Sequence, residues 1–444
     1  MTESRTERRP PIAVVGAGYV GLVSAVGLAS IGHPIELVET DRDRLSQLRN
    51  GEVPFSEPGV QEALTAALDS GGLTVLESTA RTTAGIVLVC VGTPIDDRGH
   101  ADVSAIEAVL AEVTALAHRP ITVIRSTTPV GTCQRLLRDG HVVDPSRFFT
   151  VPEFLAQGSA LRDFSAPHRV VIGRSTSADP AAEAVLVELF GVFGSPVRVV
   201  SLEEAELVKN GANAFLALKI SFTNELAGLA ERSGADIGPV LEAIGLDPRI
   251  GSTYLRPSFG FGGSCLPKEL KTIATSGLER GLPMHVTAAA TEANRAQQRL
   301  FAERVDTTIG GVAGRSIALL GLAFKPDTDD IRFSPAVELA RWLVARGARV
   351  SGYDPKAAVR AGRAVPKMTV CDTALEALEG ADVAIIATEW PEFKLLDWQL
   401  VRGLMAAPVV IDGRRLLDPA AMRDLGFDYD RVGSPPSEAA VRVS

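Results

Sequence analysis

The stretch "PIAVVGAGYVGLVSAVGLASIGHPIELVETD", residues 11–41, decides the fold of this chain. An apolar run is followed by Gly16, Gly18 and Gly21, then by a helical pattern and a second apolar run that ends in acids. Glycines at this spacing allow a tight turn, let backbone amides approach a pyrophosphate, and let the helix pack closely on the strand. The order strand, turn, helix, strand therefore predicts a βαβ unit that binds a dinucleotide.

Glu39 stands at the end of the second predicted strand, about 20 residues after the glycine turn, where dinucleotide-binding proteins carry an acid. A carboxylate there accepts hydrogen bonds from a ribose diol and would repel a 2'-phosphate. The position thus favours NAD over NADP as the cofactor. The alternative is a purely structural glycine turn, with Glu39 solvated at a strand end.

Outward from this unit, further apolar strands alternate with helical patterns and predict a mostly parallel sheet covered on both faces. From Leu202 the spacing becomes purely helical and predicts one long helix, and from Ser316 the alternation resumes without a glycine turn. We therefore expect an α/β fold with two Rossmann-like parallel-sheet domains joined by a helical domain with a long central helix. The expected domains are 1–196, 197–312 and 313–444.

Composition and charge limit the classes of partner that the chain is expected to bind. Its 444 residues are 46% hydrophobic, and 45 basic against 54 acidic residues give a net charge of −9 without long charged blocks. This balance argues against a nucleic-acid or membrane partner and favours a small molecule. The start "MTESRTERRP" lacks an apolar segment, so we expect a cytoplasmic protein, and the last dozen residues, "GSPPSEAAVRVS", are expected to be frayed.

The four cysteines, Cys90, Cys133, Cys265 and Cys371, are far apart, so the spacing predicts free thiols and no metal site. Cys265 alone follows a glycine run, in "SFGFGGSCLPKEL", residues 258–270. A lone cysteine is more often a buried core residue than a nucleophile. A thiolate nucleophile, however, needs an amide-rich or positive setting, which consecutive glycines allow. Both interpretations of Cys265 stand on these residues alone.

Several motifs occur in a fixed order along the chain: "GAGYVG", "GEVPFSEPG", "VGTP", "RSTTPVG", "PEFLAQGSA", "FGFGGSCLPKE", "GLAFKPDTDDIR", "ATEWPEF" and "IDGRRLLDP". As an ordered set they resemble the UDP-glucose 6-dehydrogenase branch of the UDP-glucose/GDP-mannose dehydrogenase family. The resemblance implies NAD-dependent oxidation of the C6 hydroxyl of a nucleotide sugar to a carboxylate, with two NAD and a thioester on Cys265. The same chemistry on GDP-mannose, dTDP-glucose or another nucleoside diphosphate hexose is one alternative. A catalytically silent NAD and nucleotide-sugar binder is another, and a one-step dehydrogenase a third.

The resemblance also implies catalytic roles for individual residues. Cys265 would be the nucleophile, while Lys209 and Asn213, spaced i and i+4 on one helix, would stabilise oxyanions at the sugar C6. Glu153 would act with water as a general acid or base. The catalytic set expected on this basis is Cys265, Lys209, Asn213, Glu153, Thr127 and Glu269.

Binding residues are implied in the same way, the last domain being expected to hold the nucleotide sugar and the helical domain the cysteine loop and dimer contacts. Those expected at NAD are Gly16, Gly18, Tyr19, Val20, Gly21, Glu39, Thr93, Thr127 and Arg332. Those expected at the sugar nucleotide are Glu153, Phe154, Leu155, Lys209, Asn213, Arg249, Tyr254, Arg256, Phe259, Gly260, Gly262 and Lys325. Arg249 matches a residue that reaches a neighbouring subunit, which implies a homodimer or a higher homo-oligomer.

Three residues depart from the family pattern. Glu269 replaces the usual aspartate and is one methylene longer, Gln157 stands where many members have an acid, and Phe333 stands where a glutamate is common. An amide cannot take a proton from water, so acid–base work would rest on Glu153 and Glu269. These departures leave the expected fold unchanged and leave the choice of substrate open.

Overall fold

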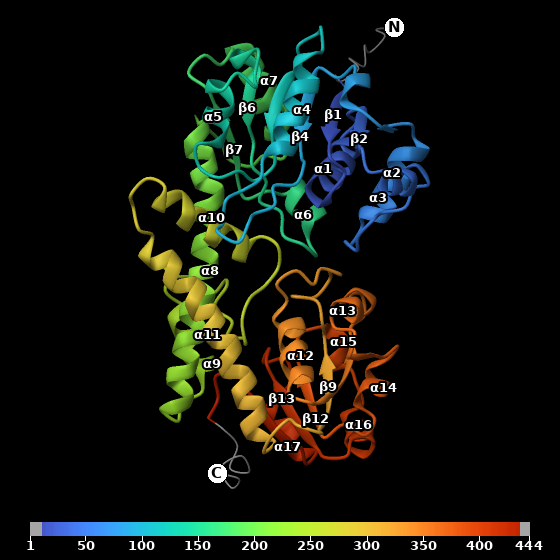
Figure 1. Cartoon of the computed structure of the whole chain (residues 1–444), viewed down its shortest axis with the longest axis vertical. Coiled ribbons are helices and arrows are strands. Elements are labelled where there is room, and N and C mark those ends of the chain that lie inside the picture. The colour runs from blue at the N-terminus through green and yellow to red at the C-terminus, as the bar shows by residue number, and fades with distance from the viewer. Residues whose placement is uncertain (1–10, 436–444) are drawn as a thin grey trace, which may run out of the picture. The chain divides into compact units, whose positions relative to one another are not determined.

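The computed structural model describes residues 11–435, which form two compact units. The first unit contains residues 11–212 together with 275–280, and the second contains 213–274 and 281–435. Each unit holds one sheet, coloured blue to green and orange to red in Figure 1. The two sheets and the long helix confirm the predicted fold class, whereas the three domain boundaries stay a prediction.

The sheet of the first unit has eight strands in the order β3-β2-β1-β4-β5-β6-β7-β8. β1 (Ile12–Val15) lies between β2 (Ile35–Val38) and β4 (Ile86–Val89) and runs parallel to both. Only β6 and β7 pair antiparallel, so the sheet is mostly parallel, as predicted. The other strands are β3 (Leu73–Leu76), β5 (Ile121–Ile124), β6 (Phe148–Thr150), β7 (Val170–Arg174) and β8 (Val197–Ser201).

Helices cover both faces of this sheet. Alternate residues of its strands point to opposite sides, so each face packs against its own set of helices. Ile12 and Val14 join a core with α1, while Ala13 and Val15 join another with α4. These buried faces explain why the strands are apolar without interruption. The helices are α1 (Tyr19–Ser30), α2 (Arg42–Arg49), α3 (Val60–Asp69), α4 (Ser104–Thr114), α5 (Thr132–Arg138), α6 (Ala160–Ser165) and α7 (Pro180–Gly191).

The sheet of the second unit is fully parallel, with the order β11-β10-β9-β12-β13-β14. Counted within the unit this is the Rossmann order 3-2-1-4-5-6. Its strands are β9 (Ser316–Leu320), β10 (Arg349–Tyr353), β11 (Thr369–Val370), β12 (Val383–Ile386), β13 (Val409–Asp412) and β14 (Asp428–Arg431). Its helices are α12 (Pro335–Ala345), α13 (Ala358–Ala364), α14 (Ala374–Leu378), α15 (Pro391–Lys394), α16 (Trp398–Leu404) and α17 (Pro419–Asp424).

The turn after β9 is filled by protein groups, which explains why this half has no glycine-rich fingerprint. A Cβ added at Gly321 would lie 2.3 Å from the Cβ of Thr388. Asp354, at the position that Glu39 occupies in the first unit, accepts hydrogen bonds from the Leu322 amide at 2.7 Å and from the Trp390 indole at 3.0 Å. This carboxylate therefore supports the turn itself rather than a ribose.

The long helix α8 (Leu202–Arg232) has 31 residues and confirms the predicted central helix. It starts at a reciprocal cap: the Glu204 amide donates to the Ser201 hydroxyl at 3.2 Å, and the Ser201 amide donates to the Glu204 carboxylate at 2.7 Å. The helical region continues with α9 (Ile237–Gly245), α10 (Leu266–Leu278) and α11 (His285–Thr308). Among residues 11–435 no helix is long and apolar enough to cross a membrane.

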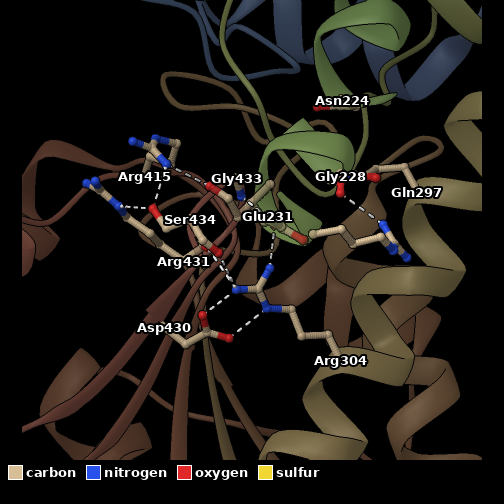
Figure 2. Close-up of polar contacts among 12 residues, drawn as sticks. Asn224, Gly228, Glu231, Gln297, Arg304, Arg415, Asp430, Arg431, Gly433 and Ser434 are labelled. Carbon is tan, nitrogen blue, oxygen red and sulfur yellow. Dashed lines mark hydrogen bonds and ion pairs between the residues drawn. The ribbon is translucent and has the colours of Figure 1, made fainter. Parts of the chain in front are cut away.

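An ion-pair network in the second unit ties β14 to the helices (Figure 2). Arg304 of α11 donates to Asp430 of β14 at 2.6 Å and to Glu231 near the end of α8 at 2.6 Å. The Gly433 amide also donates to Glu231, and Ser434 is buried. The expected fraying of the last dozen residues is therefore wrong for Gly433 and Ser434, because charged partners from far along the chain hold them. Residues 436–444 lie outside the described part of the chain.

Replacing Arg304 with methionine is expected to lower the free energy of unfolding of this unit by about 3 kcal/mol, because removing one partner of a buried ion pair leaves uncompensated charge. Asp430 and Glu231 would both lose this partner. The measurement is urea denaturation followed by circular dichroism. Arg299→Met on the same helix is the control, since Arg299 forms an exposed pair with Glu292. Equal losses for the two variants would contradict the prediction.

Candidate functional site

The glycine turn of the first unit lies between β1 and α1. Gly16 has φ of +96°, and a Cβ added at Gly21 would lie 1.8 Å from the Gly16 carbonyl oxygen. At Gly18, by contrast, nothing lies within 4 Å of an added Cβ. The turn is thus closed toward the protein and open at the helix N-terminus, beside Tyr19 and Val20. This arrangement fits the pyrophosphate of a dinucleotide.

Glu39 is fixed in place at the carboxyl end of β2. Its carboxylate accepts hydrogen bonds from the Thr40 amide at 2.8 Å, from the Ala17 amide at 3.2 Å, and from the Arg44 guanidinium at 3.0 Å. Glu39 is 5% exposed, so the alternative in which its side chain is solvated at a strand end is wrong. A carboxylate held in one orientation at this strand end suits recognition of a ribose diol. Arg44 was not anticipated from the sequence.

Replacing Glu39 with alanine is expected to raise the KM for NAD about tenfold or more, because hydrogen bonds to a charged group are worth about 1.5–3 kcal/mol. The measurement is initial-rate kinetics at saturating sugar nucleotide. Glu188→Ala, on the exposed face of α7, serves as the control. An unchanged KM in the Glu39 variant would mean that the cofactor ribose is held elsewhere.

A second group of predicted residues gathers beside this turn within the first unit. Lys209 and Glu153 form a buried ion pair, with Nζ to Oε1 at 3.2 Å and exposures of only 3% and 6%. The Lys209 ammonium also lies 5.5 Å from the centre of the Phe154 ring. Glu153 accepts from the amide of Leu155. Two fully desolvated opposite charges at such a position are expensive to maintain, which makes them candidates for chemistry rather than for stability.

Tyr19 lies close enough to this group for the Glu153 charge to act on its phenol, while Thr93 and Thr127 follow β4 and β5. The Thr93 hydroxyl donates to the Thr127 carbonyl at 2.8 Å, which joins the ends of β4 and β5. The Tyr19 hydroxyl donates to Glu57 at 2.7 Å, and burial together with the nearby carboxylates Glu57 and Glu153 raises the pKa of this phenol. Glu57, in "GEVPFSEPG", was not among the predicted site residues although its motif was noted.

In the second unit, Cys265 directly precedes α10 and is the exposed one among the four free cysteines. Cys90 and Cys133 are buried, and Cys371 is half-buried. Burial raises the pKa of the Cys90 thiol to about 12 and also raises that of Cys133. These two are core thiols, whereas Cys265 is accessible to a substrate.

The loop before Cys265 needs its glycines because other backbone packs against them. A Cβ added at Gly262 would lie 2.1 Å from the Phe333 carbonyl oxygen, and Gly263 has φ of +84°. The Gly263 amide donates to the Arg332 carbonyl at 2.9 Å. Phe333 itself has φ of +51°, an uncommon conformation for a bulky residue. The segment of residues 332–333 therefore supports the cysteine loop, a role not anticipated for Phe333.

Glu269 lies one turn after Cys265 and is buried. Its carboxylate accepts a hydrogen bond from the Asn213 side-chain amide at 2.5 Å. The structure thus brings together two of the predicted catalytic residues, one from α8 and one from α10. Lys209 and Asn213 both lie on α8, one turn apart, as the i, i+4 spacing predicted.

The other residues expected at the sugar nucleotide lie in the second unit and differ in their exposure and contacts. Phe259 is buried, whereas Arg256 is exposed and Arg249 pairs with its neighbour Asp247 at 2.6 Å. The Lys325 ammonium lies 5.7 Å from the Phe324 ring centre. Tyr254 is exposed, with φ of +66°.

Arg332 makes a two-pronged ion pair with Asp330. Its Nε and Nη2 donate to the carboxylate at 2.9 Å and 2.6 Å. Hydrogen bonding to Asp330, and more weakly the charge of Cys265, raises the pKa of this guanidinium. A positive group therefore acts electrostatically on the cysteine, in addition to its expected place at the cofactor.

Arg414 supports the cysteine loop, a role that the sequence did not reveal although its motif "IDGRRLLDP" was noted. It is buried, donates to the Ala387 carbonyl at 2.8 Å and to the Gly260 carbonyl at 3.3 Å, and lies 4.9 Å from the Phe259 ring centre. Asn294 similarly binds both backbone groups of Phe261, at 2.9 Å and 3.0 Å. Together these side chains hold the glycine run in place.

These features define the class of protein. A GxGxxG turn with a fixed acid at the next strand end binds a dinucleotide, and an accessible cysteine beside a carboxylate and an amide lies on a separate loop. Among residues 11–435, no group of His, Cys, Asp or Glu side chains could hold a metal ion. The class is an NAD-dependent dehydrogenase, and NAD fits the residues of the glycine turn.

The chain belongs to the UDP-glucose/GDP-mannose dehydrogenase family, whose models match most of its length. The NAD binding domain of the family matches residues 11–193, the central domain 203–296, and the UDP binding domain 318–419. The chain is therefore an NAD-dependent nucleotide-sugar dehydrogenase.

Individual relatives are similar over nearly their full length. A UDP-glucose 6-dehydrogenase of Pseudomonas aeruginosa is 40% identical over 96% of this chain and 97% of its own, and one of Rhizobium meliloti is 37% identical over 96% and 99%. A UDP-glucose dehydrogenase from Pyrobaculum islandicum, 37% identical, superposes with a TM-score of 0.87 over 97% and 99% of the two chains. A UDP-D-ManNAc dehydrogenase from Pyrococcus horikoshii, 25% identical, gives 0.83 over 95% and 99%.

Proposed function

We propose that this enzyme oxidises UDP-glucose to UDP-glucuronate, consuming two NAD and one water, through a thioester on Cys265. The observation that carries the proposal is the exposed Cys265, one helical turn before a buried Glu269 that binds Asn213. A dehydrogenase that stops at the aldehyde has no need for this nucleophile. The similarity to UDP-glucose 6-dehydrogenases supports glucose as the hexose.

Cys265 makes the second oxidation chemically accessible. Once the C6 hydroxyl has lost a hydride and a proton, the thiolate adds to the aldehyde carbon and forms a C–S bond. Loss of a second hydride from that carbon leaves a thioester. Water then breaks the C–S bond, releasing the carboxylate and the thiolate. NAD, when bound at the glycine turn, supplies the hydride acceptor for each oxidation.

Lys209 and Asn213 are proposed to stabilise the oxyanions of this sequence. An ammonium and an amide donor aimed at a developing negative oxygen lower its energy most where water is excluded. Lys209 is buried, so its charge is already desolvated before substrate binds. Thr127 is proposed to assist at the same centre.

Glu153 and Glu269 are proposed to manage the protons of thioester hydrolysis. Either carboxylate can take a proton from the attacking water, which Gln157 cannot do. Glu269 is anchored by Asn213, and Glu153 by Lys209, so both have fixed orientations. The replacement of aspartate by Glu269 is compatible with this role because the carboxylate is retained.

The substrate is tested by comparing kcat/KM for UDP-glucose, dTDP-glucose and GDP-mannose, with NADH absorbance as the readout. We expect UDP-glucose to be preferred at least about tenfold, a difference worth about 1.4 kcal/mol of transition-state binding. Preference for either competitor would reassign the base or the hexose. Binding of NAD and sugar nucleotide without turnover of any of them would favour the silent binder.

We propose that the enzyme is a homodimer that pairs through α8. Phe215, Phe222 and Leu229 recur every seven residues along this helix and are 59–63% exposed. An apolar stripe at this spacing fits a second helix of the same kind. Because α8 also carries Lys219, whose ammonium binds the carbonyl of Ile250 beside Arg249, pairing would engage the loop expected to serve the neighbouring subunit.

Replacing Phe222 with glutamate is expected to convert the dimer to a monomer at micromolar concentration, because a charge in an apolar interface is strongly disfavoured. Light scattering after size exclusion gives the mass. Leu395→Glu is the control, since Leu395 is an exposed apolar residue of the second unit that lies outside α8. A dimer of unchanged stability in the Phe222 variant would place the interface on another surface.

We also propose that the enzyme acts in the cytoplasm. All four of its cysteines are free thiols, as expected in a reducing compartment. An accessible Cys265 thiolate is needed for turnover and would be vulnerable to oxidation elsewhere.

A further inference from the structure

A groove between α11 and α12 in the second unit has no part in the proposed reaction. The two helices pack side by side (Figure 1) and line an open groove of about 470 Å³. This volume is within the range of about 300–1,000 Å³ that small-molecule sites occupy. Of the residues expected at the sugar nucleotide, only Phe259 lines this groove.

The walls of the groove are strongly basic. Arg295 and Arg299 project from α11 at i and i+4, and Arg341 and Arg346 come from the last turns of α12 and the residue after it. Glu338 is the one acidic residue among the lining residues. Guanidinium groups on two facing walls match a ligand with several negative oxygens, because each can form paired hydrogen bonds to phosphate.

The existing partners of these arginines are weak competitors. Arg299 pairs with Glu292, and Arg341 pairs with Glu338, but all four side chains are about half exposed or more. Exposed ion pairs contribute little, so an incoming polyanion can displace them. Arg346 stacks on the Trp342 ring at 3.9 Å, which presents an aromatic surface and a cation together.

Residues of both helices that line the groove also contact the glycine run before Cys265. Gln298 lies against Gly260, and the neighbouring Gln297 donates to the Ser258 carbonyl at 2.8 Å. On the other wall, the Pro335 ring lies 3.0 Å from a Cβ added at Gly262. Both helices that line the groove therefore touch the glycine run that precedes Cys265.

We propose that the groove between α11 and α12 is a second ligand site, which binds a di- or triphosphate group and thereby stiffens the loop that carries Cys265. Phosphate oxygens bridging the arginines of the two walls would draw α11 and α12 together. The glycine run, held by residues of both helices, would then have less freedom. The ligand is either a nucleoside di- or triphosphate or an inorganic polyphosphate, since both present the same group.

Calorimetric titration of the full-length protein with inorganic tripolyphosphate and, separately, with ATP tests the binding step. The wild type is compared with Arg295→Gln/Arg299→Gln and with the control Arg49→Gln/Arg81→Gln, whose arginines form exposed pairs with Glu77 in the first unit. We expect saturable binding that weakens at least about tenfold in the groove variant and not in the control. Tighter binding of ATP would identify a nucleotide as the ligand, and equal affinity an inorganic polyphosphate.

The coupling step is tested by hydrogen exchange of the amides in residues 258–263, with and without saturating tripolyphosphate. We expect slower exchange in the wild type and no change in the groove variant. Absence of saturable binding, or equal affinity in the groove variant, would overturn the site, and unchanged exchange in the saturated wild type would overturn the coupling. Neither readout needs turnover, so a failure here is distinguishable from a failure of the proposed reaction.

Discussion

Replacing Cys265 with alanine is expected to abolish formation of the acid, with a fall in turnover on the order of 10⁴-fold or more, because a covalent nucleophile has no substitute. Binding of NAD and of UDP-glucose should be retained, since a small side chain at an exposed position supports no core packing. Turnover is followed by NADH absorbance, and binding by calorimetry.

Cys371→Ala is the matched control for this variant. Cys371 is half-buried in the same unit, and burial raises the pKa of its thiol, so it is a poor nucleophile. Its loss should leave turnover unchanged. Full activity in the Cys265 variant would remove the thioester from the mechanism, whereas a Cys265→Ser variant that gains the mass of the sugar nucleotide would support it.

Replacing Lys209 with methionine is expected to lower turnover about 10³-fold and to destabilise the protein by about 3–5 kcal/mol. Two effects combine, since the oxyanion loses its cation and the Glu153 carboxylate becomes a buried charge without its partner. Both side chains are almost fully buried, which is why the second effect is large. Kinetics and urea denaturation measure the two losses separately.

The double variant Lys209→Met/Glu153→Gln separates catalysis from stability. Removing the orphaned carboxylate should restore most of the stability, because two neutral side chains can replace a buried pair at little cost. Turnover should stay low, because neither the cation nor the base returns. Recovery of turnover together with stability would mean that the pair is only structural. Lys367→Met, at an exposed position, controls for the loss of a lysine charge.

The sequence predicted the parts of the fold that are governed by local spacing. The βαβ unit around Gly16 follows from two apolar runs and a glycine turn, and the long helix α8 follows from a spacing of 3.6 residues; both signals lie in neighbouring residues. The position of Ser434 could not be predicted in this way. Its hydroxyl donates to Asp236, which lies 198 residues earlier in the sequence.

The sequence predicted some residues of the site and missed others, because some of their roles depend on contacts that form only in the folded chain. Residue types and motif order singled out Cys265 and Lys209, but only the structure shows that the Cys265 thiol is exposed and the Lys209 ammonium is buried. Arg414 was missed because an arginine after a strand is ordinarily solvated. Its role arises from carbonyl groups of three loops that come together only in the folded chain.

The measurement that tests the central claim most directly is the number of NADH molecules formed per molecule of UDP-glucose. The purified enzyme is given limiting UDP-glucose and excess NAD, and the reaction is followed by absorbance to completion. The account predicts two NADH per sugar, since the alcohol is oxidised to the aldehyde and the thiohemiacetal to the thioester. A yield of one NADH per sugar would contradict it, because the reaction would then stop at the aldehyde and Cys265 would have no covalent role.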